Sequence, residues 1–156
     1  MKKAVSVVVV VAALAASGAL AEDNRDKVIP EYMAAAMDCV KDYEMDFSVC
    51  KEMMKDGVDL SQAKYEPCKC VPACIAKKRK IMTEAGDYDL DAFDKAIAEM
   101  GYEPWIEEYK RVIPVCKDSF KGKKNCDAAA AFAVCGWKNS KMLRDTVGQY
   151  MGSSEE

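Results

Sequence analysis

The chain has 156 residues, 31% of them charged, and a formal net charge of −3 at pH 7. It contains no histidine, which excludes a histidine general base, a histidine metal ligand and a histidine-based pH switch. The length is typical of one domain, and the acidic balance disfavours nucleic acid as a partner because like charges repel.

Residues 1–21 predict a secretory signal peptide. Two lysines precede an apolar run from Ala4 to Ala16, and the small residues Ala19 and Ala21 fit cleavage after Ala21. The apolar run is shorter than the roughly 20 residues that a membrane span needs. We therefore expect a secreted, extracellular protein of residues 22–156 that does not insert into membranes.

After the signal peptide, the sequence predicts helix almost throughout, because apolar residues recur every three or four positions rather than alternately. The predicted helices span approximately Asp26 or Pro30 to Tyr43, Phe47 to Asp56, Cys70 to Glu84, Asp89 to Met100, Pro104 onward, Cys126 to Trp137 and Met142 to Met151. The expected fold class is all-α, a compact domain of about six or seven helices.

Local signals place the ends of these helices. Asp46 and Asp89 are expected to cap helix starts, whereas Gly57, Gly86 and Gly101 are expected to end helices. Pro72 is expected in the first turn of the helix that starts near Cys70. The helix that opens at Pro104 is expected to kink or break at Pro114, because proline lacks an N–H and clashes with the preceding turn.

The chain contains eight cysteines, an even number that predicts four disulfides in an oxidising compartment. Cys70 and Cys74 lie side by side on one helix face, a geometry that does not favour a bond between them. Cys126 and Cys135 are about 13 Å apart along one helix and cannot pair with each other. A metal site around Cys68, Cys70 and Cys74 is the alternative, which secretion and the missing histidines disfavour. Crosslinks between helices would stabilise a helical shell even around a partly hollow interior.

Six of the cysteines are spaced Cys39-x30-Cys70-x3-Cys74-x41-Cys116-x9-Cys126-x8-Cys135. This pattern resembles the six-cysteine signature of the insect odorant-binding proteins, the pheromone and general odorant-binding family. The resemblance implies the pairs Cys39–Cys74, Cys70–Cys126 and Cys116–Cys135. It leaves Cys50 and Cys68 over, and we expect these two to form an extra pair.

The resemblance also implies a function. The family's members are carriers without catalytic activity or cofactor, and they hold small apolar or amphipathic ligands in an internal cavity. The implied role is transport of odorant- or pheromone-like ligands through aqueous fluid to a membrane odorant receptor, by a monomer or weak homodimer. The alternatives are a scavenger of amines or lipids, a non-olfactory carrier in gland or reproductive fluid, and a structural or signalling protein with a filled core. A further alternative is an enzyme, which would need a clustered acid pair or an activated nucleophile, and neither has a recognisable spacing here.

Ten residues on the inner faces of the predicted helices are the candidates for the cavity lining. Nine methionines follow Met1, and their flexible side chains suit loosely specified apolar ligands, although any one of them fits a packed core equally well. Tyr109 is the expected polar contact for a ligand oxygen, with a backbone hydrogen bond as its alternative role. Tyr150 and Met151, near the end of the chain, are candidates for an apolar plug. The ten expected ligand-binding residues are Met53, Met54, Phe93, Ile97, Met100, Tyr109, Val112, Ile113, Phe132 and Trp137.

Overall fold

A computed structural model describes the backbone of residues 22–145 and, within that range, the side chains of residues 30, 31 and 34–145. The elements are α2 (Glu22–Tyr43), α3 (Phe47–Met53), the 3-10 helix η1 (Ala63–Tyr65), α4 (Glu66–Lys78), α5 (Leu90–Met100), α6 (Glu103–Cys116) and α7 (Asn125–Asn139). Residues 141–145 are also helical. Apart from one isolated bridge between Met82 and Tyr88, these residues form no β-structure, so the expected all-α fold is confirmed. The predicted signal peptide and the candidate plug at Tyr150 and Met151 lie outside the described residues.

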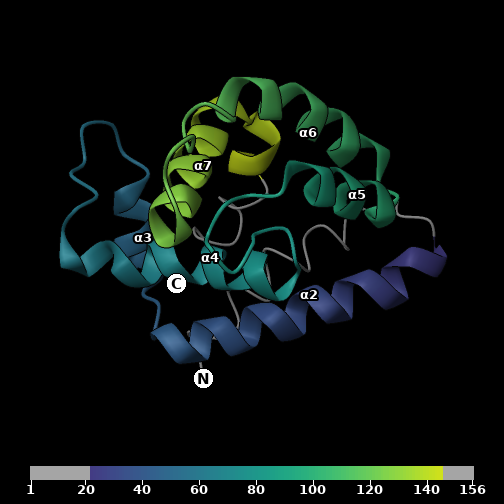
Figure 1. Cartoon of the computed structure of the whole chain (residues 1–156), viewed down its shortest axis with the longest axis horizontal. Helices are drawn as coiled ribbons and strands as arrows, with labels where there is room; N and C mark the ends of the chain where they lie inside the picture. The colour runs from purple at the N-terminus through teal and green to yellow at the C-terminus, as the bar shows by residue number, and fades with distance from the viewer. Residues whose placement is uncertain (1–21, 146–156) are drawn as a thin grey trace.

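Five of the helices contact one another in a closed ring. Around this ring α2 packs on α4, α4 on α7, α7 on α6, α6 on α5, and α5 on α2. In Figure 1, α2 runs along one side of the molecule, α6 and α7 lie on the opposite side, and the segment between α4 and α5 crosses the middle of the view. No helix among the described residues is long and apolar enough to cross a membrane.

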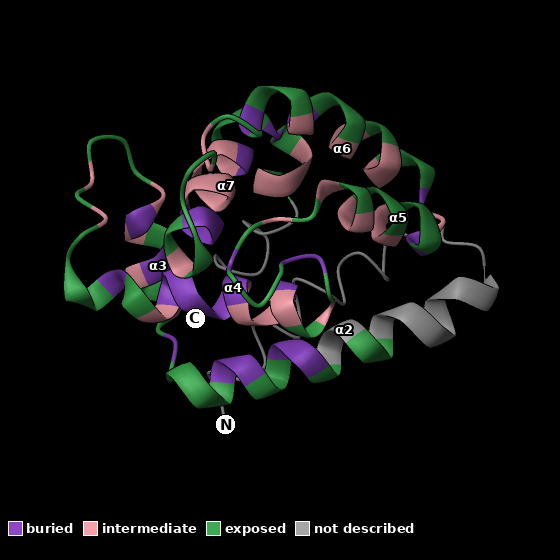
Figure 2. Cartoon of the chain, in the orientation of Figure 1, coloured by how far each residue is buried: buried purple, intermediate pink, exposed green. Residues whose placement is uncertain are grey.

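Burial is concentrated on α4, which contacts α2, α3 and α7. Figure 2 shows buried residues along α4, whereas α5, α6 and α7 carry many residues of intermediate exposure. Two packed clusters use α4 as their common wall. The first comprises Ala36, Cys39, Val40, Met45, Cys50, Met53, Tyr65, Cys68 and Val71. The second comprises Ala73, Ala76, Ile81, Met82, Ala128 and Ala129.

Disulfides join the helices crosswise, and no cysteine is free. Three of the four bonds end on α4, and α7 receives two. Three of the pairs are those that the family resemblance implies, and the fourth joins the two cysteines that the six-cysteine pattern does not include. The bonds are Cys39–Cys74 (α2 to α4), Cys50–Cys68 (α3 to α4), Cys70–Cys126 (α4 to α7) and Cys116–Cys135 (α6 to α7).

An ion pair between a buried lysine and exposed carboxylates supports the contact between α4 and α7. The Lys69 side chain is only 8% exposed, and its Nζ lies 2.7 Å from Oδ1 of Asp127 and 3.2 Å from Oε2 of Glu66. These carboxylates compensate the ammonium group for lost hydration, and the hydrogen bond to Asp127 raises the pKa of Lys69.

Several predicted helix boundaries are wrong. The third predicted helix does not start near Cys70 and reach Glu84: α4 starts at Glu66, with Pro67 in its first turn and Pro72 inside it, and ends at Lys78. The first predicted helix starts earlier, at Glu22, and contains Pro30.

Two predicted helix ends are also wrong. The second predicted helix ends at Met53, before the glycine expected to stop it. Of the kink or break expected at Pro114, the break does not occur: α6 continues to Cys116. Pro114 lies in the last turn and is exposed, so its missing N–H removes one hydrogen bond at the end of the helix.

The caps of α3 and α5 are confirmed. Asp46 Oδ1 accepts a hydrogen bond from Ser48 N at 2.9 Å, and Asp89 Oδ1 accepts one from Ala92 N at 3.0 Å. Gly101 ends α5 in the left-handed conformation, with φ of 66°. These signals are local, so the sequence alone is enough to read them.

Between α4 and α5, residues 81–89 form a short hairpin. Asp89 N donates to Ile81 O at 3.0 Å, and Thr83 N donates to Asp87 O at 2.8 Å. Gly86, at the turn, has φ of 89°, and its carbonyl accepts a hydrogen bond from Asn125 N at 2.8 Å. The hairpin is therefore fixed against the first residue of α7.

Replacing Gly86 with alanine is expected to destabilise the protein by about 2–4 kcal/mol. The new Cβ would lie 2.4 Å from the Asn125 side chain and 2.6 Å from its backbone nitrogen, in addition to the unfavourable φ. The free energy of unfolding from urea denaturation is the measurement.

Gly57→Ala is the matched control, because Gly57 also has positive φ but no atom lies within 4 Å of the position that a Cβ would take there. We expect a cost of about 1 kcal/mol for this variant, from the backbone conformation alone. Equal costs for the two variants would contradict the close packing of the hairpin on α7.

Candidate functional site

Five aromatic side chains from separate parts of the chain contact one another. We call Tyr88, Phe93, Tyr109, Phe120 and Phe132 the aromatic cluster. They come from the hairpin, α5, α6, the loop after α6, and α7 respectively.

The rings of the aromatic cluster form a connected network. The Phe132 ring centroid lies 5.5 Å from that of Tyr88, 5.7 Å from that of Phe93 and 5.6 Å from that of Phe120. Tyr109 joins through Phe93, at 4.9 Å between centroids. Edge-to-face pairs at these separations add attraction beyond the burial of area, so the rings fix one another.

Every ring of the aromatic cluster is only half-buried. The same holds for Ile97 on α5, Ile113 on α6 and Trp137 on α7, whose positions the sequence predicted to face inward. Large apolar side chains that pack together yet keep accessible surface can bury more of it against an apolar molecule. This surface is the candidate ligand site.

The remaining four predicted site residues are placed differently. Met100 and Val112 are buried, at 8% and 7% exposure, so they offer a ligand almost no accessible surface. Met53 is fully buried in the first packed cluster, and Met54 packs against the same cluster. The structure does not bring these two methionines to the aromatic cluster, and we leave them out of the candidate site.

Sequence reasoning missed Tyr88 and Phe120. Both lie outside helices, where no apolar periodicity marks an inward-facing position. The one signal that could have indicated them is that each is an aromatic residue within a polar stretch, Asp87–Asp89 for Tyr88 and Asp118–Lys121 for Phe120.

The hydroxyl of Tyr109 already has a protein partner. It donates a hydrogen bond to Asp94 Oδ1, one helix away on α5, at 2.6 Å. Burial, together with this bond, raises the pKa of Tyr109 far above its usual value, so the phenol is neutral at physiological pH. Tyr109 thus joins α5 to α6, and its hydroxyl is less available to a ligand than the sequence suggested.

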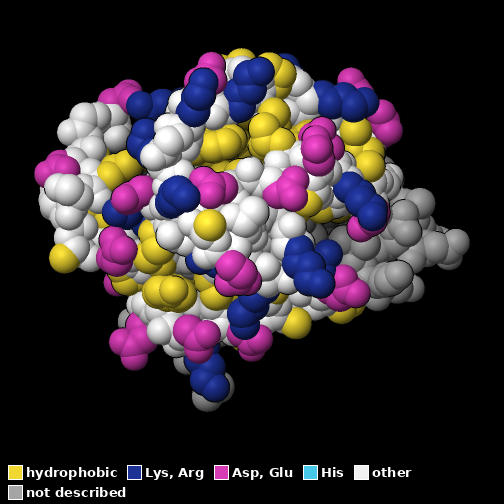
Figure 3. Space-filling view, in the orientation of Figure 1, with side chains coloured by type: hydrophobic (Ala, Val, Ile, Leu, Met, Phe, Trp, Pro, Cys, Tyr) yellow, Lys and Arg dark blue, Asp and Glu magenta, His cyan; other side chains and the backbone are white. Residues whose placement is uncertain are grey.

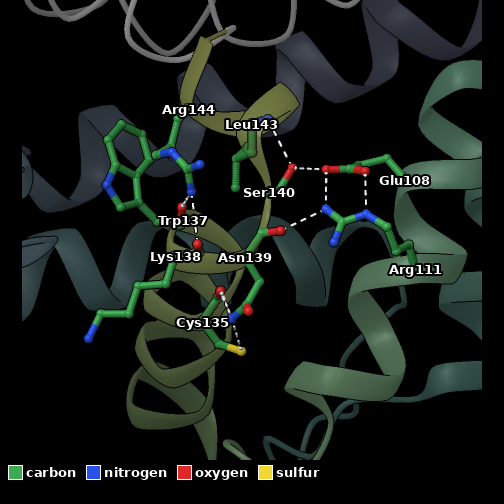
Figure 4. Close-up of polar contacts among 9 residues, drawn as sticks. All are labelled: Glu108, Arg111, Cys135, Trp137, Lys138, Asn139, Ser140, Leu143 and Arg144. Atoms are coloured by element: carbon green, nitrogen blue, oxygen red, sulfur yellow. Dashed lines mark hydrogen bonds and ion pairs between the residues drawn. The ribbon is translucent and has the colours of Figure 1, made fainter.

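A polar network fixes the end of α7 against α6. Glu108 accepts two hydrogen bonds from Arg111, at 2.7 and 2.9 Å, and one from Ser140 Oγ. Arg111 also donates to the carbonyl of Asn139 at 2.6 Å, and Ser140 Oγ accepts from Leu143 N at 3.0 Å. Figure 4 shows how these groups converge from α6 and from the residues that end α7.

Arg144 completes this network from the far side. Its Nη1 donates to the carbonyls of Trp137 and Lys138, at 2.6 and 2.8 Å, and so satisfies acceptors that the end of α7 leaves open (Figure 4). The network therefore sets both the position of Trp137 and the direction in which the chain leaves α7.

A separate pocket of about 490 Å³ lies near the start of α7. It is lined by Leu60, Ser61, Lys69, Gly122, Lys123, Lys124, Asp127, Ala130 and Ala131. None of the ten predicted site residues lines it. Its charged groups are paired with protein partners, Lys69 with Asp127 and Lys124 with Asp87.

Charges are mixed on the face shown in Figure 3. Hydrophobic side chains reach the surface over α6 and α7, and lysine, arginine and acidic side chains alternate around them. Within the described residues, the one group that could hold a metal ion is Glu66, Cys70 and Cys126. The two sulfur atoms are bonded to each other, so they are not thiolate ligands.

Comparison with known proteins gives one match. The model of the PBP/GOBP family matches residues 21–139, which cover most of the chain and every helix around the aromatic cluster. No curated protein and no solved structure matches the chain.

Replacing Glu108 with glutamine is expected to lower the free energy of unfolding at pH 7 by about 1 kcal/mol. The Glu108 side chain is 14% exposed, and the hydrogen bonds from Arg111 and Ser140 hold its pKa below the ordinary value. This stabilisation is complete above the ordinary carboxyl pKa of about 4.3 and is lost as the pH falls through the lower folded-state pKa. Urea denaturation from pH 7 to pH 3 should show the difference between wild type and E108Q vanishing in acid.

Glu107→Gln is the control, because Glu107 is the adjacent residue but its side chain is 62% exposed in its pair with Lys110. We expect E107Q to leave stability nearly unchanged, since solvent screens exposed pairs. If E107Q and E108Q behaved alike, the network at the end of α7 would not be a stabilising contact.

Proposed function

The chain belongs to the PBP/GOBP family, and we propose that it is a secreted carrier that binds a small hydrophobic, odorant- or pheromone-like ligand on the aromatic cluster and transports it through aqueous extracellular fluid. The family is one of binding and carrier proteins. The observation that carries the proposal is the half-buried apolar surface of the aromatic cluster, whose rings come from α5, α6, α7 and the segments beside them.

The binding energy would come from burial of apolar area. A ligand that buries roughly 200–300 Å² gains about 25 cal/mol per Å², before the costs of ordering it. This gross gain of about 5–7.5 kcal/mol corresponds by itself to a Kd between roughly 200 μM and 3 μM, and the ordering costs weaken it, so micromolar affinity needs a larger buried area. Half-buried Phe93, Ile97, Ile113, Phe132 and Trp137 are the side chains that we propose contact the ligand.

We propose no catalytic role. Among the described carboxylates, Glu108 is mostly buried, but Arg111 and Ser140 already bind both of its oxygens. This arrangement also gives no support to the alternative of an amine scavenger, which would need a buried carboxylate free to face the ligand.

The remaining parts of the proposal concern the whole chain. Residues 1–21 would be removed as a signal peptide, and residues 22–156 would form one ligand-binding domain. The carrier would act as a monomer or weak homodimer and would deliver its ligand to a membrane odorant receptor.

Replacing Ile113 with aspartate is expected to weaken binding of the fluorescent probe N-phenyl-1-naphthylamine at least about tenfold. A carboxylate inside the candidate site must lose water when an apolar ligand covers it, and the apolar side chains proposed to contact the ligand carry no charge to compensate it. Fluorescence titration of the oxidised protein is the measurement.

Val115→Asp is the control for the probe experiment. Val115 lies two residues further along α6, and its 56% exposure places it on the outer face. We expect V115D to bind the probe like wild type. Equal losses in both variants, or no saturable binding to wild type, would refute the proposed site.

Export from insect cells is expected to yield a chain that begins at Glu22, since small residues occupy the two positions that signal peptidase reads. N-terminal sequencing of the protein in the medium tests this. Retention in the cells with an intact Met1 would contradict the proposed secretion.

A further inference from the structure

The hydroxyl of Tyr88 has no hydrogen-bond partner among the residues that the structure describes. Its ring contacts Phe93, Phe120 and Phe132, and none of these side chains can accept a conventional hydrogen bond. A buried phenol usually finds a partner, because leaving the O–H unpaired forfeits the hydrogen bonds that it makes in water. The Tyr88 hydroxyl is not one of the fully buried polar atoms, so water or a ligand can reach it and supply the acceptor that the described part of the chain does not.

The environment of Tyr88 is apolar and yet accessible. Burial raises the pKa of the Tyr88 hydroxyl far above its ordinary value, with no hydrogen bond or charge contributing. The side chain nevertheless keeps intermediate exposure. The group is thus largely removed from bulk water but is not sealed by protein atoms, as expected for a side chain that faces a binding space.

The backbone holds Tyr88 in place from both sides. The residue forms the β-bridge with Met82, and Asp89 N is bonded to Ile81 O. The turn of the same hairpin is bonded to Asn125 at the start of α7. The Tyr88 hydroxyl is therefore a preorganised donor, which reduces the entropy lost when it binds an acceptor.

We propose that the Tyr88 hydroxyl donates a hydrogen bond to the bound ligand, and that the ligand is a neutral molecule with a flat apolar body and a carbonyl or ester oxygen. The proposal rests on the carrier function above and assigns the polar contact to Tyr88 in place of Tyr109. The aromatic rings around Tyr88 match a flat apolar body, because they pack edge-to-face or offset against such surfaces.

Charged ligands do not fit this position. The acids beside Tyr88 in the chain, Asp87 and Asp89, are exposed and bound elsewhere: Asp87 pairs with Lys124 at 3.2 Å, and Asp89 caps α5. A charged ligand would lose its hydration at the aromatic cluster, and Asp94, the carboxylate bound to Tyr109, is exposed and already accepts a hydrogen bond, so it offers an ammonium ligand no buried partner. A ligand with a neutral hydrogen-bond acceptor loses less hydration free energy and gains the hydrogen bond from the Tyr88 hydroxyl.

The test compares two probes of nearly equal shape, acetophenone and α-methylstyrene, which differ by a carbonyl oxygen in place of a CH₂ group. Their affinities are measured by displacement of N-phenyl-1-naphthylamine from wild type, Y88F and Y109F. We expect Y88F to lose about five- to tenfold in affinity for acetophenone and to bind α-methylstyrene as wild type does. Y109F should keep the wild-type ratio of the two affinities.

Thermal unfolding of the ligand-free variants gives a second readout. Because the Tyr88 hydroxyl makes no hydrogen bond to the described part of the chain, Y88F is expected to unfold at or above the wild-type Tm. Y109F loses its bond to Asp94 and is expected to unfold at a lower Tm.

Each other result overturns the proposal. Equal losses for both probes in Y88F would show that the ring, not the hydroxyl, contributes. No loss for either probe, or a lower Tm for ligand-free Y88F, would assign the hydroxyl no role or a structural one. If the naphthylamine probe does not bind wild type, the carrier function itself fails, and this outcome is distinguishable from the others.

Discussion

Covalent crosslinks onto α4 are the constraint on which the rest of the structure depends. This helix of 13 residues carries cysteines bonded to α2, α3 and α7, and it also forms a wall of both packed clusters. Disulfides restrict the unfolded chain, so they contribute stability without requiring that every inner surface be packed. The aromatic cluster keeps accessible apolar surface in a domain whose size would otherwise favour a continuous core.

The two sides of the molecule consequently differ in how they are stabilised. On the α3 side, Met53 and Tyr65 are almost completely buried in a dense apolar cluster. On the side of α5, α6 and α7, aromatic pairs, the Tyr109–Asp94 bond and the network around Glu108 hold the elements at fixed positions while leaving surface open. Directional contacts of this kind suit a site that must keep its shape when empty.

The fold class, the caps of α3 and α5 and most helix positions could be predicted because their signals lie within a few neighbouring residues. Asp89 and Gly101, for example, bound α5 through local hydrogen bonds and a local φ. The start of α4 could not be predicted correctly, since Pro67 and Pro72 are both compatible with a first helical turn and tertiary contacts decide between them. Tyr88 and Phe120 reach the site through loop geometry, and Met53 packs in the first cluster because α3 contacts α4 and η1. Neither outcome is encoded in helical periodicity.

The contacts between neighbouring helices of the ring differ in whether a covalent link crosses them. Disulfides cross the junctions of α2 with α4, α4 with α7 and α7 with α6, and two residues of backbone link α5 directly to α6. Among the described helices, the junction of α2 with α5 has neither a sulfur bridge nor an adjoining linker. Separating α2 from α5 is therefore the one way to widen the ring of helices without straining a covalent connection. The contact between these two helices is mechanically the weakest in the ring.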